Sequence, residues 1–311
     1  MDKQSPYYHQ VSLLMSMLPI VAKEPVFALK GGTAINLFVR NFPRLSVDID
    51  LAYLPLVPRN EALTHVKTAL LRMTDLINAQ PNTRAVLQEQ KQDTLRIVVS
   101  RLNATIKIEV SPVARGTLHK PDMLAVQESV EEEFGYAEIP VVSVPDLYGG
   151  KLCAAMDRQH PRDLFDVRML LKEEGISREI FVGFITYALS HPRPINEVMA
   201  PRWQPLERTF QSEFQGMTFE PVELDDLVST RFEMVTALQA HFTEKDRAFL
   251  LSFKQGNPDW TLFDYPKAAD LPAIRWKLHN ISALAKNREK HKVQLTKLET
   301  VLNDWLKCAP H

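Results

Sequence analysis

The sequence is poor in cysteine and has no long apolar run. Its 311 residues include two cysteines, Cys153 and Cys308, far apart in the chain. This excludes a disulfide scaffold and a cysteine-based zinc site, and it is typical of a reducing compartment. The apolar stretch 11–22 is too short to span a bilayer, and the leader MDKQSPYYHQ lacks the positive segment of a signal peptide. We therefore expect a cytoplasmic protein that does not enter the membrane.

Net charge and several catalytic motifs are also missing. A formal net charge of −1 argues against a globally basic nucleic-acid binder, although a local basic patch remains compatible with it. The chain contains neither the GxxxxGK[ST] pattern of a P-loop nor GxGxxG, and it lacks HExxH and the GxSxG elbow. A phosphate-binding site would therefore be of another kind, and a serine nucleophile is not expected.

What the sequence does contain is a pair of acids within an apolar strand. The stretch FALKGGTAINLFVRNFPRLSVDIDL begins with a short apolar run that ends at a double glycine, and it closes on Asp48 and Asp50. Residues two apart on a strand point to the same face. Without partners, two such carboxylates cost roughly several kcal/mol in repulsion and desolvation. We therefore expect cationic groups beside them.

A third acid, Glu109, lies in the later strand IKIEV, where an apolar residue would be unremarkable. Asp48, Asp50 and Glu109 on strands of one sheet are the oxygen ligands that two-metal phosphoryl transfer requires. We therefore predict that these three residues bind Mg²⁺, with Mn²⁺ as an alternative ion. The competing interpretation is that the aspartates lie at a strand end and face water.

The double glycine offers a binding surface for phosphate. Lys30, Gly31, Gly32 and Thr33 lie where the first strand gives way to a helix, so backbone N–H groups and a hydroxyl can meet phosphate oxygens. Ser46 shares a strand face with the first aspartate of the pair, so its hydroxyl can contact a phosphate or a metal-bound water. Alternatively, Ser46 caps the loop before the strand.

A second cluster follows in KLCAAMDRQHPRDLFDV. Asp163 and Asp166 are three residues apart and share one face of the expected helix. Near a nucleotide, Lys151 would pair with triphosphate oxygens, and one of the aspartates would orient that lysine or accept a proton. Alternatively, the acids favour a helix start and pair with neighbouring arginines such as Arg162.

With LKGGTAINL, RLSVDIDL, IKIEV and this cluster in order over residues 30–168, the chain resembles the AbiEii/AbiGii toxin family, to which the MenT toxins belong. That family is part of the polymerase-β-type nucleotidyltransferase superfamily. The resemblance implies that Lys151, Arg162, Asp163 and Asp166 match the lysine and the RDxxD element of the family's catalytic motifs, with Lys151 and Arg162 in contact with the nucleotide. It does not decide which aspartate is essential.

The resemblance implies an enzyme that transfers a nucleoside monophosphate from an NTP to an acceptor hydroxyl, with the 3′ end of tRNA as the expected acceptor. It implies a toxin of a toxin–antitoxin or phage-exclusion pair, whose partner is an AbiEi-type or MenA-type antitoxin. In some members a serine or threonine at the place of Ser46 is phosphorylated to silence the enzyme. The alternatives are a protein or small-molecule acceptor, such as an antibiotic, and a non-catalytic NTP-binding module.

The pattern of elements predicts an α+β protein in two domains. Residues 1–150 are expected to form the nucleotidyltransferase core, with a mixed sheet and an N-terminal helix. Residues 151–311 are expected to be all-helical and to complete the active site with their first helices. Within them, the proline-containing stretch 191–222 is interpreted as a linker or long loop, and 222–255 and 270–307 as helical segments.

Some residues outside these motifs are candidates for contact with nucleic acid. The C-terminal segment carries a group of cations: Lys286, Arg288, Lys290, Lys292 and Lys297. They form either a contact for RNA phosphates or a solvated helix face. Arg40 and Arg44 flank the loop before the acidic strand and are placed to meet a nucleotide or an acceptor end. The four tryptophans are expected in the core: Trp203, Trp260, Trp276 and Trp305.

Overall fold

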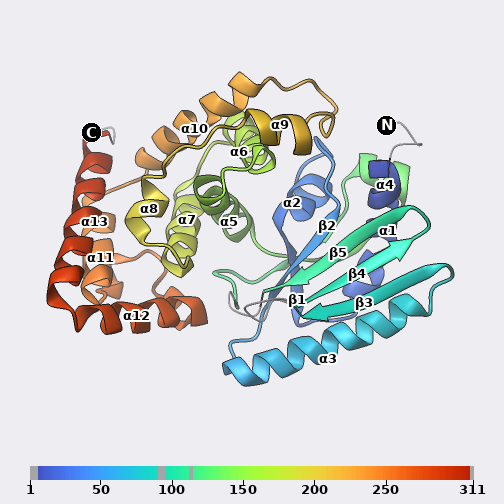
Figure 1. Ribbon diagram of the computed structural model, residues 1–311, viewed down its shortest axis with the longest axis horizontal. Helices are drawn as coiled ribbons and strands as arrows, with labels where there is room; N and C mark the ends of the chain where they lie inside the picture. Colours follow the sequence, from blue (N-terminus) through green and yellow to red (C-terminus); the bar gives the residue numbers. More distant parts are fainter. Residues whose placement is uncertain (1–5, 90–94, 112–114, 309–311) are drawn as a thin grey trace. The chain divides into compact units, whose positions relative to one another are not determined.

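The chain folds as two units, each with its own core (Figure 1). The computed structural model describes residues 6–89, 95–111 and 115–308. The first unit comprises Met1–Ser143 and Gln215–Val222, and the second comprises Val144–Phe214 and Glu223–His311. The predicted domain boundary between residues 150 and 151 lies inside helix α5 (Val144–Asp157), which belongs wholly to the second unit.

The first unit is built on a seven-stranded sheet in the order β3-β4-β5-β2-β1-β7-β6. The pairs β2–β5 and β1–β7 are parallel, and the remaining neighbours are antiparallel, so the predicted mixed sheet is confirmed. The strands are β1 (Phe27–Lys30), β2 (Asp48–Tyr53), β3 (Thr83–Glu89), β4 (Leu95–Arg101), β5 (Ala104–Val110), β6 (Asp122–Ala125) and β7 (Glu138–Val141).

Apolar residues of the central strands bury one face of the sheet against helices. Helix α1 (Pro6–Val21) packs on β5 and β7, and α3 (Arg59–Asn78) packs on β3 and β4. Ile49 and Ile108 are fully buried within this core. Strand β6 and the acidic helix α4 (Glu128–Phe134) had no clear period in the sequence and were not predicted.

A segment distant in sequence completes the first unit. Leu45 N donates to Met217 O at 2.8 Å, and Arg44 forms an isolated β-bridge with Thr218. Phe219 packs on Phe42, with 5.2 Å between their ring centroids. The stretch interpreted as a linker therefore contributes pairing to the loop that precedes β2. The interpretation of 191–222 as a linker or long loop is wrong, because the stretch also contains helices α8 (Ile195–Met199) and α9 (Glu207–Glu213).

The second unit is helical throughout its described part, as predicted. After α5 come α6 (Pro161–Glu173), α7 (Arg178–Ser190), α8 (Ile195–Met199), α9 (Glu207–Glu213), α10 (Leu224–Gln239), α11 (Glu244–Gln255), α12 (Pro272–Ala285) and α13 (Arg288–Cys308), with 3-10 turns at Trp260–Leu262 and Pro266–Asp270. Two of these helices, α8 and α9, lie within the supposed linker. The segment 222–255 is two helices, because Thr243 and Asp246 form a capping box that starts α11.

Two glycines allow helices α5 and α7 to cross closely. A Cβ on Gly183 would lie 2.3 Å from the carbonyl oxygen of Pro145, and a Cβ on Gly149 would lie 2.4 Å from the Gly183 carbonyl carbon. No side chain fits at these distances, so the backbones meet directly. Packing of this kind positions α5, which carries one of the predicted catalytic residues.

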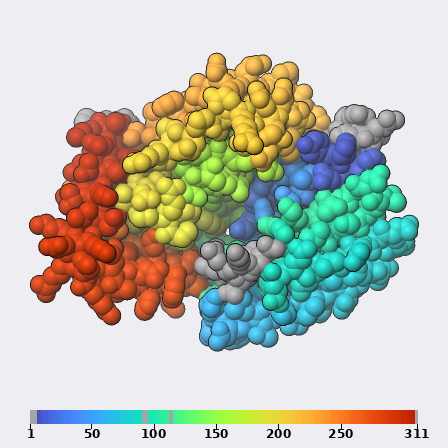
Figure 2. Space-filling model, viewed as in Figure 1, coloured from blue at the N-terminus to red at the C-terminus, as the bar shows by residue number. Residues whose placement is uncertain are grey.

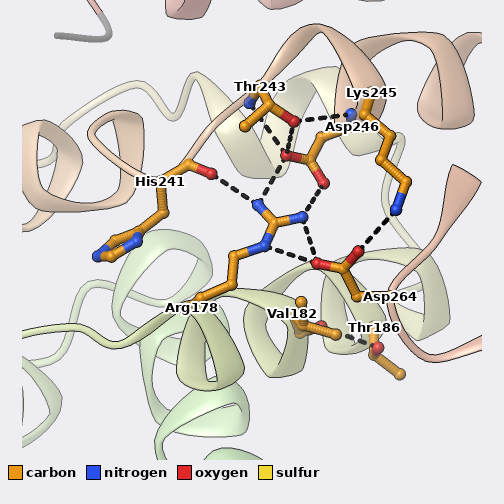
Figure 3. A network of polar contacts seen from close by, with 8 residues as sticks. All are labelled: Arg178, Val182, Thr186, His241, Thr243, Lys245, Asp246 and Asp264. Carbon is orange, nitrogen blue, oxygen red and sulfur yellow. Dashed lines mark hydrogen bonds and ion pairs between the residues drawn. The ribbon is translucent and has the colours of Figure 1, made fainter.

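An ion-pair network around the buried Asp246 ties α7 to α11 (Figure 3). Arg178 donates from both Nη atoms to the Asp246 carboxylate, at 2.7 and 2.6 Å, and from Nε to Asp264 Oδ2 at 2.7 Å. Lys245 approaches the other oxygen of Asp264 at 3.0 Å. Burial alone would raise the pKa of Asp264, but these hydrogen bonds from Lys245 and Arg178 outweigh it and lower that pKa.

Candidate active site

The two acids of SVDIDL project from one face of β2. Asp48 and Asp50 are half-buried, while Ile49 between them is fully buried on the opposite face. Strand β5 runs parallel to β2, and Glu109 is the register partner of Asp50. Residues paired across neighbouring strands share a face and lie close together. The structure therefore places the predicted third acid beside the second, as the strand pattern required.

Cations lie next to these acids, as expected from the cost of burying like charges. Lys30, the last residue of β1, is the antiparallel register partner of Asp50. Arg96 on β4 is paired with Glu109 in the antiparallel ladder, and its Nη1 lies 3.6 Å from Glu109 Oε1. Arg96 was not identified from the sequence; its place beside Glu109 follows from the antiparallel pairing of β4 with β5.

The first glycine of the pair lies against the Asp50 carboxylate. Gly31 has φ +76°, a left-handed conformation that side chains rarely adopt. A Cβ at this position would lie 2.6 Å from Asp50 Oδ2. Both the backbone conformation and the space therefore require glycine here, and the carboxylate lies directly against bare backbone.

The second glycine makes room for a buried cation and a hydroxyl. A Cβ on Gly32 would lie 2.7 Å from Arg44 Nη2 and 3.0 Å from Ser46 Oγ. Arg44 is only 2% exposed, and its Nη1 donates to the carbonyl oxygen of Leu45 at 2.7 Å. The positive charge of Arg44 therefore lies beside the double glycine. From the sequence, Arg44 was expected only in the loop before the acidic strand.

The hydroxyls of Thr33 and Ser46 join the helix α2 (Gly31–Ala34) to the start of β2. Thr33 Oγ1 and Ser46 Oγ are 3.0 Å apart, and Thr33 Oγ1 also donates to the carbonyl oxygen of Asp48. Both residues are buried. These bonds hold the glycine turn and the acidic strand together. The predicted contacts of Thr33 and Ser46 with a nucleotide stay predictions.

The donor set of this face suits a hard cation. Carboxylate oxygens are the ligands that Mg²⁺ prefers, and Mg²⁺ is commonly held by one or two carboxylates together with waters and substrate phosphates. Within residues 6–89, 95–111 and 115–308, no three His, Cys, Asp or Glu side chains form a ready-made metal cluster. The acids of β2 and β5 supply donors of the type that Mg²⁺ prefers, and the binding of Mg²⁺ stays a prediction.

The second cluster lies in the helical unit and centres on a buried lysine. Lys151 Nζ lies 3.0 Å from Asp163 Oδ1 and 2.9 Å from Asp166 Oδ2, and all three side chains are almost fully buried. Arg158 forks onto Asp163 with hydrogen bonds of 2.6 and 2.8 Å. Burial alone would raise the pKa of Asp163, but the Lys151 charge and the Arg158 hydrogen bonds hold that pKa far below its ordinary value.

A neutral histidine starts the helix that carries these aspartates. His160 is the N-cap of α6, and its Nδ1 accepts from Arg162 N at 3.1 Å. Because Nδ1 accepts a hydrogen bond, the proton of the neutral ring is on Nε2. Nε2 lies 3.1 Å from Glu213 Oε2 and can donate to it. Burial lowers the pKa of His160, against the opposing effect of Glu213. The predicted contact of Arg162 with a nucleotide stays a prediction.

Comparison with known proteins decides the family. A family described as the nucleotidyl transferase AbiEii toxin of type IV toxin–antitoxin systems matches residues 12–280, which is most of the chain. The chain belongs to the AbiEii family. The resemblance inferred from the four motifs is confirmed, and the match continues well beyond them into the helical unit. A search of curated proteins gave no match.

The fold of this AbiEii chain is also found in a solved structure. MenT4, a nucleotidyltransferase toxin from Mycobacterium tuberculosis, aligns with a TM-score of 0.62 over 91% of this chain and 94% of that chain, at 15% sequence identity. At this identity the likeness shows the fold. It confirms the predicted α+β architecture, a mixed sheet followed by helices.

Membership of the AbiEii family identifies the enzyme class and one partner. The protein is a nucleotidyltransferase of a toxin–antitoxin system, and an antitoxin is the partner that such a system implies. None of the helices in the described residues combines the length and the apolar character needed to cross a bilayer.

Proposed function

We propose that this AbiEii toxin transfers a nucleoside monophosphate from an NTP to the 3′-terminal hydroxyl of tRNA and so blocks translation. The acceptor hydroxyl gives up its proton to solvent as its oxygen attacks the α-phosphorus, the bond from that phosphorus to the α,β-bridging oxygen breaks, and pyrophosphate leaves. The observation that carries this proposal is the pairing of Asp50 and Glu109 across β2 and β5, beside the bare backbone of Gly31. Such a surface offers carboxylate oxygens as metal ligands beside exposed backbone.

We propose that Asp48, Asp50 and Glu109 hold Mg²⁺, with Mn²⁺ as a substitute. When bound, the ion would supply positive charge for the nucleotide phosphates. Its support is the oxygen-only donor set of this face. The nearby cations Lys30 and Arg96 offset the carboxylate charge in the absence of metal.

The Lys151 cluster is proposed as a second essential part of the enzyme. Asp163 and Asp166 each accept from Lys151, so its ammonium is fixed in position and cannot rotate freely. Arg158 engages Asp163 as well. We propose that the two aspartates together hold Lys151 in position for the nucleotide phosphates.

The acceptor and the partner rest on the family. We propose a tRNA acceptor because the family resemblance implies it, and an AbiEi-type antitoxin because the matched family is a type IV toxin–antitoxin toxin. A basic, exposed C-terminal helix adds support from this chain for a polyanionic substrate. We propose that the enzyme acts in the cytoplasm, where tRNA is found.

The test is to incubate the purified protein with Mg²⁺, total tRNA and each α-labelled NTP separately, beside Asp48→Ala. The proposal predicts labelled tRNA with one preferred NTP, and no label from the variant. Label on protein or on a small molecule alone would refute the tRNA acceptor and keep the chemistry. Tight NTP binding without pyrophosphate release would refute transfer itself and favour a nucleotide-binding module.

A further inference from the structure

The end of α12 and the first half of helix α13 carry an unusual excess of unpaired positive charge. Residues 286–297 contain five cations and one acid, Glu289, in a chain whose formal net charge is −1. We call these five cations the basic corner: Lys286, Arg288, Lys290, Lys292 and Lys297. All five are exposed, and none makes an ion pair within the part of the chain that the structure describes.

The other acids of this helix are already engaged elsewhere. Glu299 Oε1 lies 3.4 Å from Arg247 Nη2, and Asp304 Oδ1 lies 3.0 Å from Lys307 Nζ. They therefore do not neutralise the basic corner. Like charges three or four residues apart on a helix destabilise it by about 0.2–0.5 kcal/mol per pair. The basic corner lowers the stability of the helix and forms no ion pairs among the described residues. Binding of an anionic partner explains it better than a contribution to the stability of the fold.

Four of the five cations are exposed residues of α13. Leu298, Leu302 and Trp305 are the buried residues of this helix, so its apolar face is occupied within the unit. Lys290 and Lys297 lie seven residues apart on one exposed stripe. Figure 2 shows α12 and α13, coloured orange-red to red, on the surface of the second unit.

A tryptophan on the preceding helix adds a flat apolar surface. Trp276 is 61% exposed, so the expectation that all four tryptophans lie in the core is wrong at this position, whereas Trp305 is buried as expected. Its ring stacks on His279, with 5.5 Å between centroids and 20° between planes. Along α12, Trp276 lies about 15 Å from Lys286, at 1.5 Å per residue.

We propose that the basic corner and the Trp276–His279 stack form an RNA-binding surface. The cations contact backbone phosphates, and an unpaired base stacks on the tryptophan, as in other sequence-tolerant RNA contacts. This inference rests on the proposed function, because it assigns a binding surface to the RNA acceptor. An anionic membrane is disfavoured, because a helix that lies on lipid exposes a broad apolar face and α13 buries its own.

The test measures tRNA binding by fluorescence anisotropy over a range of salt concentrations, without NTP or Mg²⁺. The test variant is Arg288→Gln/Lys290→Gln/Lys292→Gln/Lys297→Gln. The matched control removes four exposed cations from other elements: Lys23→Gln/Arg84→Gln/Lys120→Gln/Lys172→Gln. Both variants change net charge equally, and circular dichroism and thermal melting show that both fold.

We expect the test variant to bind tRNA at least ~10-fold more weakly at 0.1 M salt, with the slope of log K against log salt reduced by about 3, whereas the control stays close to the wild type. Trp276→Ala should weaken binding without changing the slope, because stacking releases no counterions. Equal losses in the two quadruple variants, or an unchanged slope in the test variant, would overturn the proposal. So would a test variant that loses binding to phosphatidylserine vesicles and keeps its affinity for tRNA.

Label transfer from each α-labelled NTP to tRNA, measured beside binding for the wild type and both quadruple variants, separates this inference from the proposed function. If tRNA binds through the basic corner but no NTP labels it, the transfer proposal fails and the binding surface stands. If tRNA is labelled and both quadruple variants bind it alike, the binding surface fails and the transfer proposal stands.

Discussion

Gly31 and Asp50 approach so closely that a Cβ on residue 31 would lie 2.6 Å from the Asp50 Oδ2 atom. The antiparallel pairing of β1 with β2 sets this distance, because it aligns Lys30 with Asp50 at the strand ends. The spacing between the double glycine and the two aspartates therefore reflects a direct contact in space. The glycine turn and the acidic strand form one structural element.

Replacing Gly31 with alanine should disturb both folding and activity. The left-handed backbone alone costs about 1–2 kcal/mol for alanine, and the clash with Asp50 adds about 1–3 kcal/mol of overpacking. Gly175→Ala is the matched control, since Gly175 has φ +75° and nothing lies within 4 Å of an added Cβ. Urea unfolding should show a larger loss of stability for Gly31→Ala than for Gly175→Ala. Equal losses in the two variants would contradict the close contact.

Lys151 should be a major source of stability in the second unit. Lys151→Met leaves Asp163 and Asp166 buried without their shared cation, and breaking a buried pair costs about 3–5 kcal/mol. Adding Asp166→Asn should restore part of the loss, because Arg158 still holds Asp163. Chemical unfolding of the single and double variants forms a thermodynamic cycle. Additive losses would show that the Lys151–Asp166 pair does not exist.

Gly183→Ala should separate α5 from α7. The added methyl group would lie 2.3 Å from the Pro145 carbonyl oxygen. Because this neighbour is a backbone atom, no side-chain movement can relieve the clash. We expect a loss of about 1–3 kcal/mol in the free energy of unfolding. Gly150→Ala is the control, because its nearest neighbour would be 3.4 Å away on the Tyr187 ring. A thermal melt of Gly183→Ala that matches the wild type would contradict the close crossing.

Stability should fall at mildly acidic pH because of His160. Its folded pKa is lowered by burial, so the unfolded chain binds the proton more readily. The contribution of neutral His160 to the free energy of unfolding is complete above the ordinary histidine pKa near 6.5. It is lost as the pH falls from there toward the lowered pKa of the folded state. His160→Asn, which keeps an N-cap side chain, should remove this dependence. Unfolding measured between pH 7.5 and 5 checks it, and an unchanged slope in the variant would contradict the assignment.

Much of the first unit followed from sequence because its signals are local. The acids of β2 interrupt an otherwise apolar strand, and Glu109 alternates with buried neighbours, so face and register could be inferred. Arg96 lay within reach of the same reasoning, since a hairpin aligns each residue with a partner. Gly31 was identified as a turn, but its contact with Asp50 depends on the pairing of two strands.

The remaining features depend on contacts between distant segments. Residues 215–222 pair with the loop before β2 through Met217 and Thr218. No local sequence pattern predicts that this segment pairs with the first unit. The capping box of Thr243 and Asp246 starts α11 and so separates it from α10. It was overlooked because the helical periodicity continues on both sides of it. Burial of Arg44 depends on both the glycine turn and this returning segment.

The central claim is that the acids of β2 and β5 carry nucleotidyl transfer, and Asp50→Asn tests it most directly. This change keeps the shape of the side chain and removes the charge, while Asp122→Asn changes an exposed aspartate at the edge of the same sheet. Label transfer from α-labelled NTP to tRNA should fall by at least ~100-fold in Asp50→Asn and stay unchanged in Asp122→Asn, with both variants folded. Full activity of Asp50→Asn would contradict the assignment of this site.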